Sequence, residues 1–262
     1  MRTNTLREKL NADAPTLATH IHTTWPTIIE VLGHTGAYDY VEFVAEYAPF
    51  DLHDLDNLAR AAELHDLGTM IKVDAEHRAY VAQRAVGSGF GSVLFADVRD
   101  PEEARECVRC VRPDTPDDGG TFGVEMRRFA YMGYGGTEDY VRALREVVVM
   151  LMIEKKSAVD QLEEMLSVEG VDMVQWGGAD YSMSIGKAGH RDAPEIAAAQ
   201  EKVFQTALEQ GVHPRAEINT ADDAKRYLDM GVRHFCIGTD VTVLHGYWRD
   251  QGDAMRRALA GE

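Results

Sequence analysis

The sequence predicts an α/β fold, a single (β/α)8 TIM barrel spanning residues 1–262. Three observations predict it: apolar strand-like runs alternate with amphipathic helical stretches, the runs number about eight, and no linker-like change in composition divides the chain. A length of 262 residues suits one such barrel. An open, doubly wound parallel sheet is the alternative, because six strands would suffice for it.

The expected strands are short runs rich in β-branched, aromatic and other apolar residues. An additional run at His20–Thr23, just before Trp25 and Pro26, is weak by itself but is needed as the first strand of a closed barrel. The clear runs are Tyr38–Glu46, Thr69–Asp74, Ser92–Val98, Val147–Glu154, Val171–Gly178, His213–Ile218 and Arg233–Asp240.

Amphipathic helices are expected between these strands. Two begin with strong start signals, because Asp100 can cap a helix that has Pro101 in its first turn, and Thr220 precedes the acids Asp222 and Asp223. The expected helices are Leu52–Leu64, Ala79–Val86, Pro101–Val111, Ser157–Leu166, Pro194–Gln210 and Ala221–Met230.

One segment interrupts the alternation. Pro113–Gly136 contains six glycines and a cluster of turn-forming residues, so it predicts a long loop between the helix after strand four and strand five. Loops of that length in a compact domain are usually functional or disordered.

Charge and composition exclude several classes of function. The formal charge of −17 arises from 44 acidic and 27 basic residues, and such a surface repels nucleic-acid phosphates. No window approaches the ~18 apolar residues of a membrane span, and no secretory signal is recognisable at the N-terminus. Three cysteines cannot all pair within one chain, and the Cys107–Cys110 spacing falls in a helix, where a structural role is favoured. We therefore expect a cytoplasmic protein with no nucleic-acid and no membrane partner.

The chemistry is expected at the carboxyl ends of the strands, where barrel enzymes have their active sites. Six of these ends bring an acid, and converging carboxylates repel one another unless a cation lies between them. Carboxylate oxygens suit Mg²⁺ or Mn²⁺ better than Zn²⁺. The strand ends supply Glu46, Tyr47, Lys72, Asp97, Glu154, the segment Gly177–Asp180, Glu217 and Asp240.

Glu154 and Asp180 are the strongest metal candidates among these acids. Glu154 ends an apolar strand, and Asp180 follows Gly177 and Gly178, a glycine pair that allows a ligand to approach the backbone. The alternatives are structural: Glu154 as an acid at a helix start and Asp180 as a loop cap.

Several segments resemble the HpcH/HpaI aldolase family, which includes the 4-hydroxy-2-oxoheptanedioate aldolases. The likeness extends from about Trp25 to Leu244 and is most specific over Glu154–Gly186. The segments that carry it are Tyr38–Glu46, Met70–Val73, Met152–Val159, Val168–Asp172 and Gly177–Gly186.

The resemblance implies a class II retro-aldol reaction that gives pyruvate or a related 2-oxo acid and an aldehyde. It implies that Glu154 and Asp180 hold a divalent metal, Mg²⁺ or Mn²⁺, with Co²⁺ as a further candidate, which stabilises an enolate. It also implies a homo-oligomer, usually a hexamer built as a trimer of dimers, in which the last helix is exchanged between protomers.

The resemblance assigns further site residues. Backbone N–H groups of Gly177, Gly178 and Ala179 are expected to bind the substrate carboxylate, and Glu46 matches an acid that supports metal-bound water. Lys72 stands where the family has an Arg that steadies the keto oxygen, which keeps the charge but not a two-pronged hydrogen bond. Met152 replaces a Gln beside the metal-binding Glu.

Both members of the family's proton-transferring His–Asp dyad are absent, because Tyr47 replaces the His and Gly87 lies at the approximate position of the Asp, which a neighbouring subunit supplies. The family's Arg-Gly-x-Gly substrate loop becomes Gly120–Gly123. Tyr47 or metal-bound water is expected to move the proton instead. His190 is the best candidate for a site histidine.

Two alternatives to a metal-dependent aldolase remain open. One is a barrel that binds metal and a 2-oxo acid without turnover, and the other is an aldolase in which Lys72, Lys155 or Lys156 forms a Schiff base. The aldehyde partner is not readable from the sequence. Polar residues near the expected mouth that are candidates for binding it are Glu217, Arg127, Arg128 and the glycine-rich loop.

Overall fold

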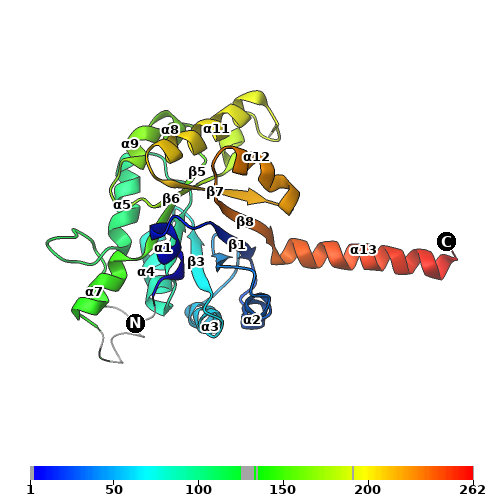
Figure 1. The fold of residues 1–262 in the computed structure, drawn as a ribbon, viewed down its shortest axis with the longest axis horizontal. Coiled ribbons are helices and arrows are strands. Elements are labelled where there is room, and N and C mark those ends of the chain that lie inside the picture. The colour runs from blue at the N-terminus through cyan, green and yellow to red at the C-terminus, as the bar shows by residue number, and fades with distance from the viewer. Residues whose placement is uncertain (1–2, 125–132, 134, 191, 262) are drawn as a thin grey trace.

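The eight strands form a closed, all-parallel barrel (Figure 1) in a computed structural model that describes residues 3–124, 133, 135–190 and 192–261. Each strand pairs with the next, and β8 pairs with β1, so the predicted (β/α)8 barrel is confirmed over the open sheet. The strands are β1 (Thr16–Ile21), β2 (Tyr40–Val44), β3 (Gly68–Val73), β4 (Ser92–Phe95), β5 (Val148–Ile153), β6 (Met173–Trp176), β7 (His213–Ile218) and β8 (His234–Thr239).

The first strand begins four residues earlier than the sequence analysis placed it. Thr16 pairs with His234 of β8, and Ala18 pairs with Tyr40 of β2. These polar and small residues give little hydrophobic signal, and pairing on both sides makes them a strand. His20 therefore lies near the carboxyl end of β1 rather than at its start.

The helices follow the expected alternation with two internal breaks. The stretch Ser157–Leu166 is two short helices because Gln161 leaves helical geometry at φ −115°, and the stretch Ala221–Met230 begins as a 3-10 turn. Asp100 caps its helix as predicted, accepting hydrogen bonds from two backbone N–H groups. The helices between strands are α2 (Pro26–His34), α3 (Leu52–Glu63), α4 (Arg78–Ser88), α5 (Pro101–Val111), α7 (Glu138–Arg145), α8 (Lys156–Asp160), α9 (Leu162–Leu166), α10 (Gly178–Ser184), α11 (Pro194–Glu209), η1 (Ala221–Asp223) and α12 (Ala224–Asp229).

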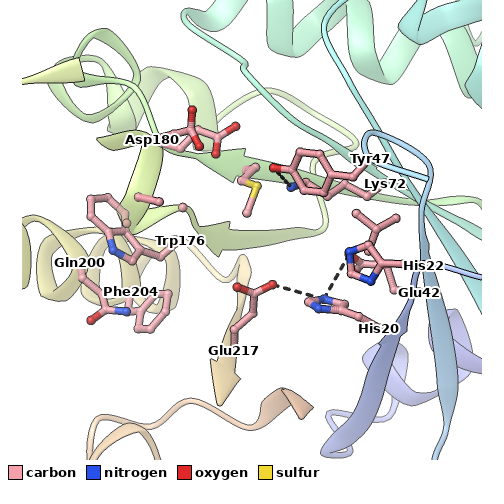
Figure 2. Close-up of a pocket in the computed structure, with 16 residues that line it drawn as sticks. His20, His22, Glu42, Tyr47, Lys72, Trp176, Asp180, Gln200, Phe204 and Glu217 are labelled. Carbon is pink, nitrogen blue, oxygen red and sulfur yellow. Dashed lines mark hydrogen bonds and ion pairs between the residues drawn. The ribbon is translucent and has the colours of Figure 1, made fainter. Parts of the chain in front are cut away.

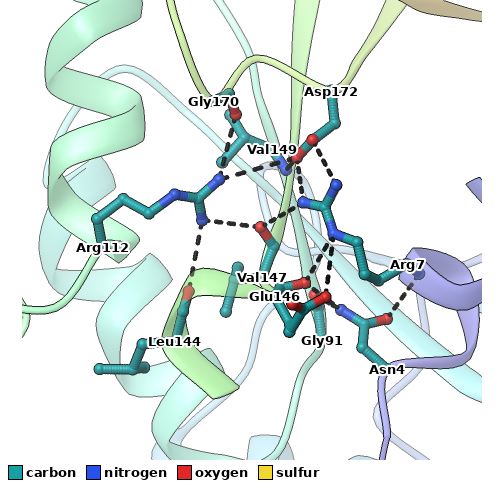
Figure 3. A network of polar contacts seen from close by, with 10 residues as sticks. All are labelled: Asn4, Arg7, Gly91, Arg112, Leu144, Glu146, Val147, Val149, Gly170 and Asp172. Carbon is teal, nitrogen blue, oxygen red and sulfur yellow. Dashed lines mark hydrogen bonds and ion pairs between the residues drawn. The ribbon is translucent and has the colours of Figure 1, made fainter. Parts of the chain in front are cut away.

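A short helix that the sequence analysis did not anticipate, α1 (Thr5–Asn11), contributes Leu6 and Leu10 to the same apolar cluster as the barrel interior. Polar contacts hold it against the ends where strands begin (Figure 3). Arg7 donates two hydrogen bonds to Asp172, at 2.6 and 2.7 Å, and Asn4 donates to backbone carbonyls of Gly91 and Glu146. This end of the barrel is therefore closed by charge-matched contacts.

Residues 113–124 of the glycine-rich segment lie at this same end. Pro113 bridges to Phe122, and Arg145, just before β5, donates to Asp118. Gly120 is required by space, because a Cβ there would be 2.0 Å from the carbonyl oxygen of Arg112. These residues therefore lie opposite the carboxyl ends of the strands.

The last helix, α13 (Asp240–Ala260), projects away from the barrel (Figure 1). Apart from the side chain of Asp240 at its start, none of it is buried. Within the ranges described above, no helix has the length and apolar character that crossing a bilayer requires.

Candidate active site

A cavity of about 330 Å³ opens at the carboxyl ends of the strands, as predicted for a barrel enzyme (Figure 2). Nine residues were assigned a catalytic, substrate-binding or metal role from the sequence; eight of them line the cavity, and the ninth, Glu46, contacts one of the eight. The eight are Tyr47, Lys72, Met152, Glu154, Gly177, Gly178, Ala179 and Asp180.

Glu154 follows β5 and is 3% exposed, so it is a carboxylate with little access to water. Its Oε1 accepts a hydrogen bond of 2.7 Å from the backbone N–H of Asp97, which adopts a left-handed φ of 57°. Gly177 must be glycine, because a Cβ there would be 2.4 Å from Glu154 Oε2. Burial raises the pKa of Glu154 to about 7, and the neighbouring carboxylates of Asp180 and Asp97 add to that effect.

The carboxylates beside Glu154 already attract a cation. The ammonium of Lys155 forms ion pairs with Asp97 and, at 3.1 Å, with Asp180. The described residues hold no preformed group of three or more His, Cys, Asp or Glu ligands, so the protein would supply two carboxylates and leave other positions to substrate or water. A buried acid with a raised pKa beside a second carboxylate fits a divalent cation, which would favour the ionised form of both.

Lys72 lies across the cavity and is held as an ammonium ion. Its side chain forms an ion pair with Glu46, and its Nζ lies 3.5 Å from the Tyr47 hydroxyl and 4.9 Å from the centre of that ring. Burial works against the charged form, but the hydrogen bond and charge of Glu46 outweigh it and raise the pKa of Lys72. Burial also raises the pKa of Tyr47, so its hydroxyl stays protonated.

The glycine turn and Met152 lie in the cavity wall, but the Gly177 N–H, one of the three expected donors, donates to the Ile153 carbonyl. The first turn of α10 begins at Gly178 beside Glu154, and among the described residues the N–H groups of Gly178 and Ala179 have no backbone partner. Met152 is 5% exposed and forms an apolar part of the cavity wall.

At the base of the cavity is a closed ring of five polar side chains, of which His20, Glu42 and Glu217 line the cavity. Only Glu217 was a site candidate from the sequence. His20 Nε2 lies 3.3 Å from Glu42 and 3.2 Å from Glu217. Gln175 donates to Glu217 at 2.7 Å and accepts from Arg215 at 2.6 Å. Arg215 closes the ring through an ion pair with Glu42, and both are 0% exposed. We call these five residues, His20, Glu42, Gln175, Arg215 and Glu217, the inner ring.

Charges within the inner ring stabilise one another. Burial opposes the ionised form of Glu42, yet Arg215 and His20 together lower its pKa well below the usual range. Burial likewise lowers the pKa of His20, whereas contacts with Cys236 and Glu42 raise it well above the ordinary value.

The histidines of the site are His20 and His22, and His190 is not among the lining residues. His190 is exposed in the connection between α10 and α11. Although it follows Asp180 closely in the sequence, it does not reach the cavity. The remaining wall is formed by Val44, Trp176, Gln200 and Phe204, whereas Arg127 and Arg128 lie outside the described residues.

Comparisons with known proteins agree with this geometry. The family model described as HpcH/HpaI aldolase/citrate lyase matches residues 19–245. The chain is 28% identical over 242 residues to a 4-hydroxy-2-oxo-heptane-1,7-dioate aldolase from Escherichia coli, covering 92% of this chain and 90% of that protein. It is 27% identical over 233 residues to a 5-keto-4-deoxy-D-glucarate aldolase from Klebsiella pneumoniae, covering 88% and 89%.

A solved structure of an HpcH/HpaI aldolase/citrate lyase family protein from Burkholderia cenocepacia superimposes with a TM-score of 0.85 at 26% identity, covering 97% of this chain and 100% of that one. The match is therefore to the whole barrel and not to one motif. This chain belongs to the HpcH/HpaI aldolase/citrate lyase family and is an enzyme of its carbon–carbon lyase kind.

Proposed function

We propose that this enzyme is a divalent-metal-dependent aldolase that cleaves or forms a 4-hydroxy-2-oxo acid, with a pyruvate-type 2-oxo acid and an aldehyde as the other reactants. The observation that carries the proposal is the pair Glu154 and Asp180, which line one cavity at adjacent strand ends. A buried carboxylate whose pKa is raised to about 7 is costly as an anion unless a cation accompanies it.

Glu154 and Asp180 would hold the ion, and their oxygen donors suit Mg²⁺ or Mn²⁺, with Co²⁺ as a further candidate. When bound, the ion supplies positive charge that stabilises the enolate of the 2-oxo acid. Lys155 already pairs with Asp180, so its ammonium would have to move or remain beside the ion.

The chain's own groups then orient the substrate. Lys72 is a fixed positive charge for the keto oxygen, and Glu46 keeps it in place and ionised. The N–H groups of Gly178 and Ala179 serve the substrate carboxylate, whereas the Gly177 N–H already donates to the Ile153 carbonyl at 3.1 Å, and Met152 excludes water beside them. Tyr47 has a protonated hydroxyl next to Lys72 and can donate a hydrogen bond or a proton to substrate.

A Schiff-base mechanism is less well supported by these contacts. It requires a neutral amine, whereas each candidate lysine has a carboxylate partner that favours the ammonium ion: Lys72 with Glu46, Lys155 with Asp97 and Asp180, and Lys156 with Asp160.

The test is carbon–carbon bond formation from pyruvate and a panel of aldehydes with Mg²⁺ or Mn²⁺ present. We expect a chelator to abolish the reaction and added metal to restore it, and we expect borohydride with pyruvate to leave the enzyme active. Irreversible borohydride inactivation would establish the imine instead. Binding of Mg²⁺ and pyruvate without any bond formation or cleavage would establish the non-catalytic binding protein.

We also propose that the enzyme is a homo-oligomer, a trimer of dimers, in which α13 packs on a neighbouring copy. The helix has no buried residue, yet it carries large apolar side chains that one barrel leaves in water, and such patches mark interfaces. A monomer in light scattering, unchanged by Trp248→Glu, would contradict this. The exposed apolar residues of α13 are Val241, Val243, Leu244, Tyr247, Trp248, Met255 and Leu259.

A further inference from the structure

His22 lies just beyond β1 and lines the cavity beside Tyr47 (Figure 2). The two rings are nearly parallel, 11° apart, with centroids separated by 6.4 Å. Tyr47 occupies the position at which the family resemblance implies a proton-transferring histidine. An imidazole from a different strand is therefore next to the place where the family's own imidazole is missing.

Contacts on the other side of the ring determine which nitrogen of His22 is basic. His22 Nδ1 lies 2.8 Å from Thr239 Oγ1, and the Thr239 hydroxyl donates to Asp240 Oδ1 at 3.2 Å. A hydroxyl has one proton, so Thr239 accepts from His22 while it donates to Asp240. This arrangement places the ring proton on Nδ1 and leaves the lone pair on Nε2.

Asp240 is well placed to stabilise the protonated ring. Its side chain is 5% exposed, and its Oδ1 lies 3.6 Å from His22 Nδ1. The carboxylate accepts hydrogen bonds from the backbone N–H groups of His22, Thr23 and Val241. A carboxylate fixed behind an imidazole orients the ring and lies beside the imidazolium that forms when Nε2 takes a proton.

The other candidate groups are already committed to partners. The Nε2 atom of His20 lies within reach of two carboxylates of the inner ring and is inaccessible to solvent. Lys72 is an ammonium paired with Glu46. Among the described residues, His22 Nε2 has no hydrogen-bond partner, so it is available to substrate.

We infer that His22 is the proton-transfer residue of this aldolase, with Thr239 and Asp240 as its positioning residues; the inference rests on the proposed function. In cleavage, His22 Nε2 takes the proton of the C4 hydroxyl, the O–H electron pair forms the aldehyde C=O bond, and the C3–C4 bond breaks with its electron pair passing to the enolate. The imidazolium then returns the proton to C3, which gives the 2-oxo acid. No oxidant or reductant is needed.

The last proton transfer can be measured without knowing the aldehyde. We would follow exchange of the pyruvate methyl protons in D₂O by NMR, with Mg²⁺ and the full-length enzyme. General acid–base residues typically contribute about 10²–10⁴-fold, so we expect His22→Asn to slow exchange at least ~100-fold and Thr239→Val about 10-fold. His53→Asn, at an exposed histidine of α3, is the matched control and should exchange at the wild-type rate.

Two further readouts separate chemistry from damage to the site. Calorimetry should show Mg²⁺ and pyruvate binding to His22→Asn within about threefold of wild type, and added imidazole should restore exchange to His22→Ala but not to Glu154→Gln. If His22→Asn does not fold, Thr239→Val with the same two measurements decides.

Wild-type exchange in His22→Asn, or a loss in Tyr47→Phe that exceeds the loss in His22→Asn, would overturn the role of His22 and leave the aldolase proposal standing. Absence of exchange in the wild-type enzyme with saturating Mg²⁺ and pyruvate would instead overturn the proposed function, and this inference with it.

Discussion

The two ends of the barrel hold polar clusters that differ in charge balance. At the end where strands begin, Asp172 meets Arg7 at 2.6 and 2.7 Å and Arg112 at 3.9 Å, and it accepts the Val149 N–H at 2.8 Å (Figure 3). At the carboxyl end, Asp97 and Asp180 share one cation, Lys155, while Glu154 has no ion-pair partner among the described residues and burial raises its pKa to about 7.

This difference in charge balance distinguishes groups that stabilise the fold from groups that we propose to bind a ligand. Matched charges with many hydrogen bonds, as at Asp172, contribute to folding because removal of one partner leaves the others buried and unpaired. A buried acid whose pKa is raised, as at Glu154, opposes folding in the absence of a cation, and the proposed metal binding would account for its presence.

Glu154→Gln should have the largest effect on activity and no adverse effect on the metal-free fold. We expect the aldolase rate to fall at least ~1,000-fold, because the ion that stabilises the enolate loses a ligand. Gln keeps an oxygen for the Asp97 N–H, so denaturant unfolding of the metal-free variant should show a free energy equal to or above that of wild type. A large loss of metal-free stability would erase the proposed contrast.

Asp172→Asn should show the opposite pattern. Loss of the carboxylate leaves Arg7 and Arg112 without their anion, so we expect the free energy of unfolding to fall by about 3 kcal/mol. The activity per folded molecule should remain at the wild-type value, measured below the unfolding transition. A variant of wild-type stability, or one that folds fully but is inactive, would show that this end is not purely structural.

A pH effect should also originate at the strand-beginning end. Burial and the neighbouring His213 lower the pKa of His234 to about 4, so the folded protein disfavours its protonated form. The unfolded chain therefore binds more protons below the ordinary pKa of 6.5, and the stability present above pH 6.5 declines as pH falls toward 4.

Between pH 6.5 and 5 this amounts to about 1.5 kcal/mol for His234. Unfolding curves at the two pH values should show that loss in wild type and a smaller loss in His234→Gln. An equal loss in both proteins would assign the acid sensitivity to other groups.

The smallest expected effect comes from an exposed ion pair far from both clusters. Lys225 and Asp229 are 81% and 64% exposed and one helical turn apart at 2.7 Å. Lys225→Ala should change the free energy of unfolding by less than about 0.5 kcal/mol and leave activity unchanged. A larger change in the free energy of unfolding would mean that the exposure of an ion pair does not predict its contribution to stability, and the comparison of the two clusters would lose that basis.

The sequence was sufficient for the barrel and for the metal-site candidates. The apolar run of strand five ends at Glu154, and the glycine pair before Asp180 is visible in the sequence. Both acids could therefore be chosen because barrel enzymes have their active sites at the carboxyl ends of the strands. The predicted start of β1 was wrong because Thr16 and Ala18 give little hydrophobic signal. They belong to the strand because they pair with residues of β8 and β2.

The rest of the site depends on residues that only the closed barrel brings together. Glu42 and Arg215 are 173 positions apart and meet inside the barrel, and neither ends a strand. The alternation of side chains along a strand offered a clue, because every second residue points into the barrel. The polar residues at positions 20 and 22, 42, and 215 and 217 all fall on these inward positions. The pairing of His22 with Thr239 and Asp240 requires β1 and β8 to be neighbours, which follows from closure.

The most direct test of a metal held by Glu154 and Asp180 is a calorimetric titration of the metal-free enzyme with Mn²⁺ in the presence of pyruvate. We expect one saturable site per chain in wild type and no saturable binding in Glu154→Gln or Asp180→Asn, with Asp172→Asn retaining the wild-type affinity. Retained Mn²⁺ affinity in both site variants would contradict the account, because the ion would then be bound elsewhere.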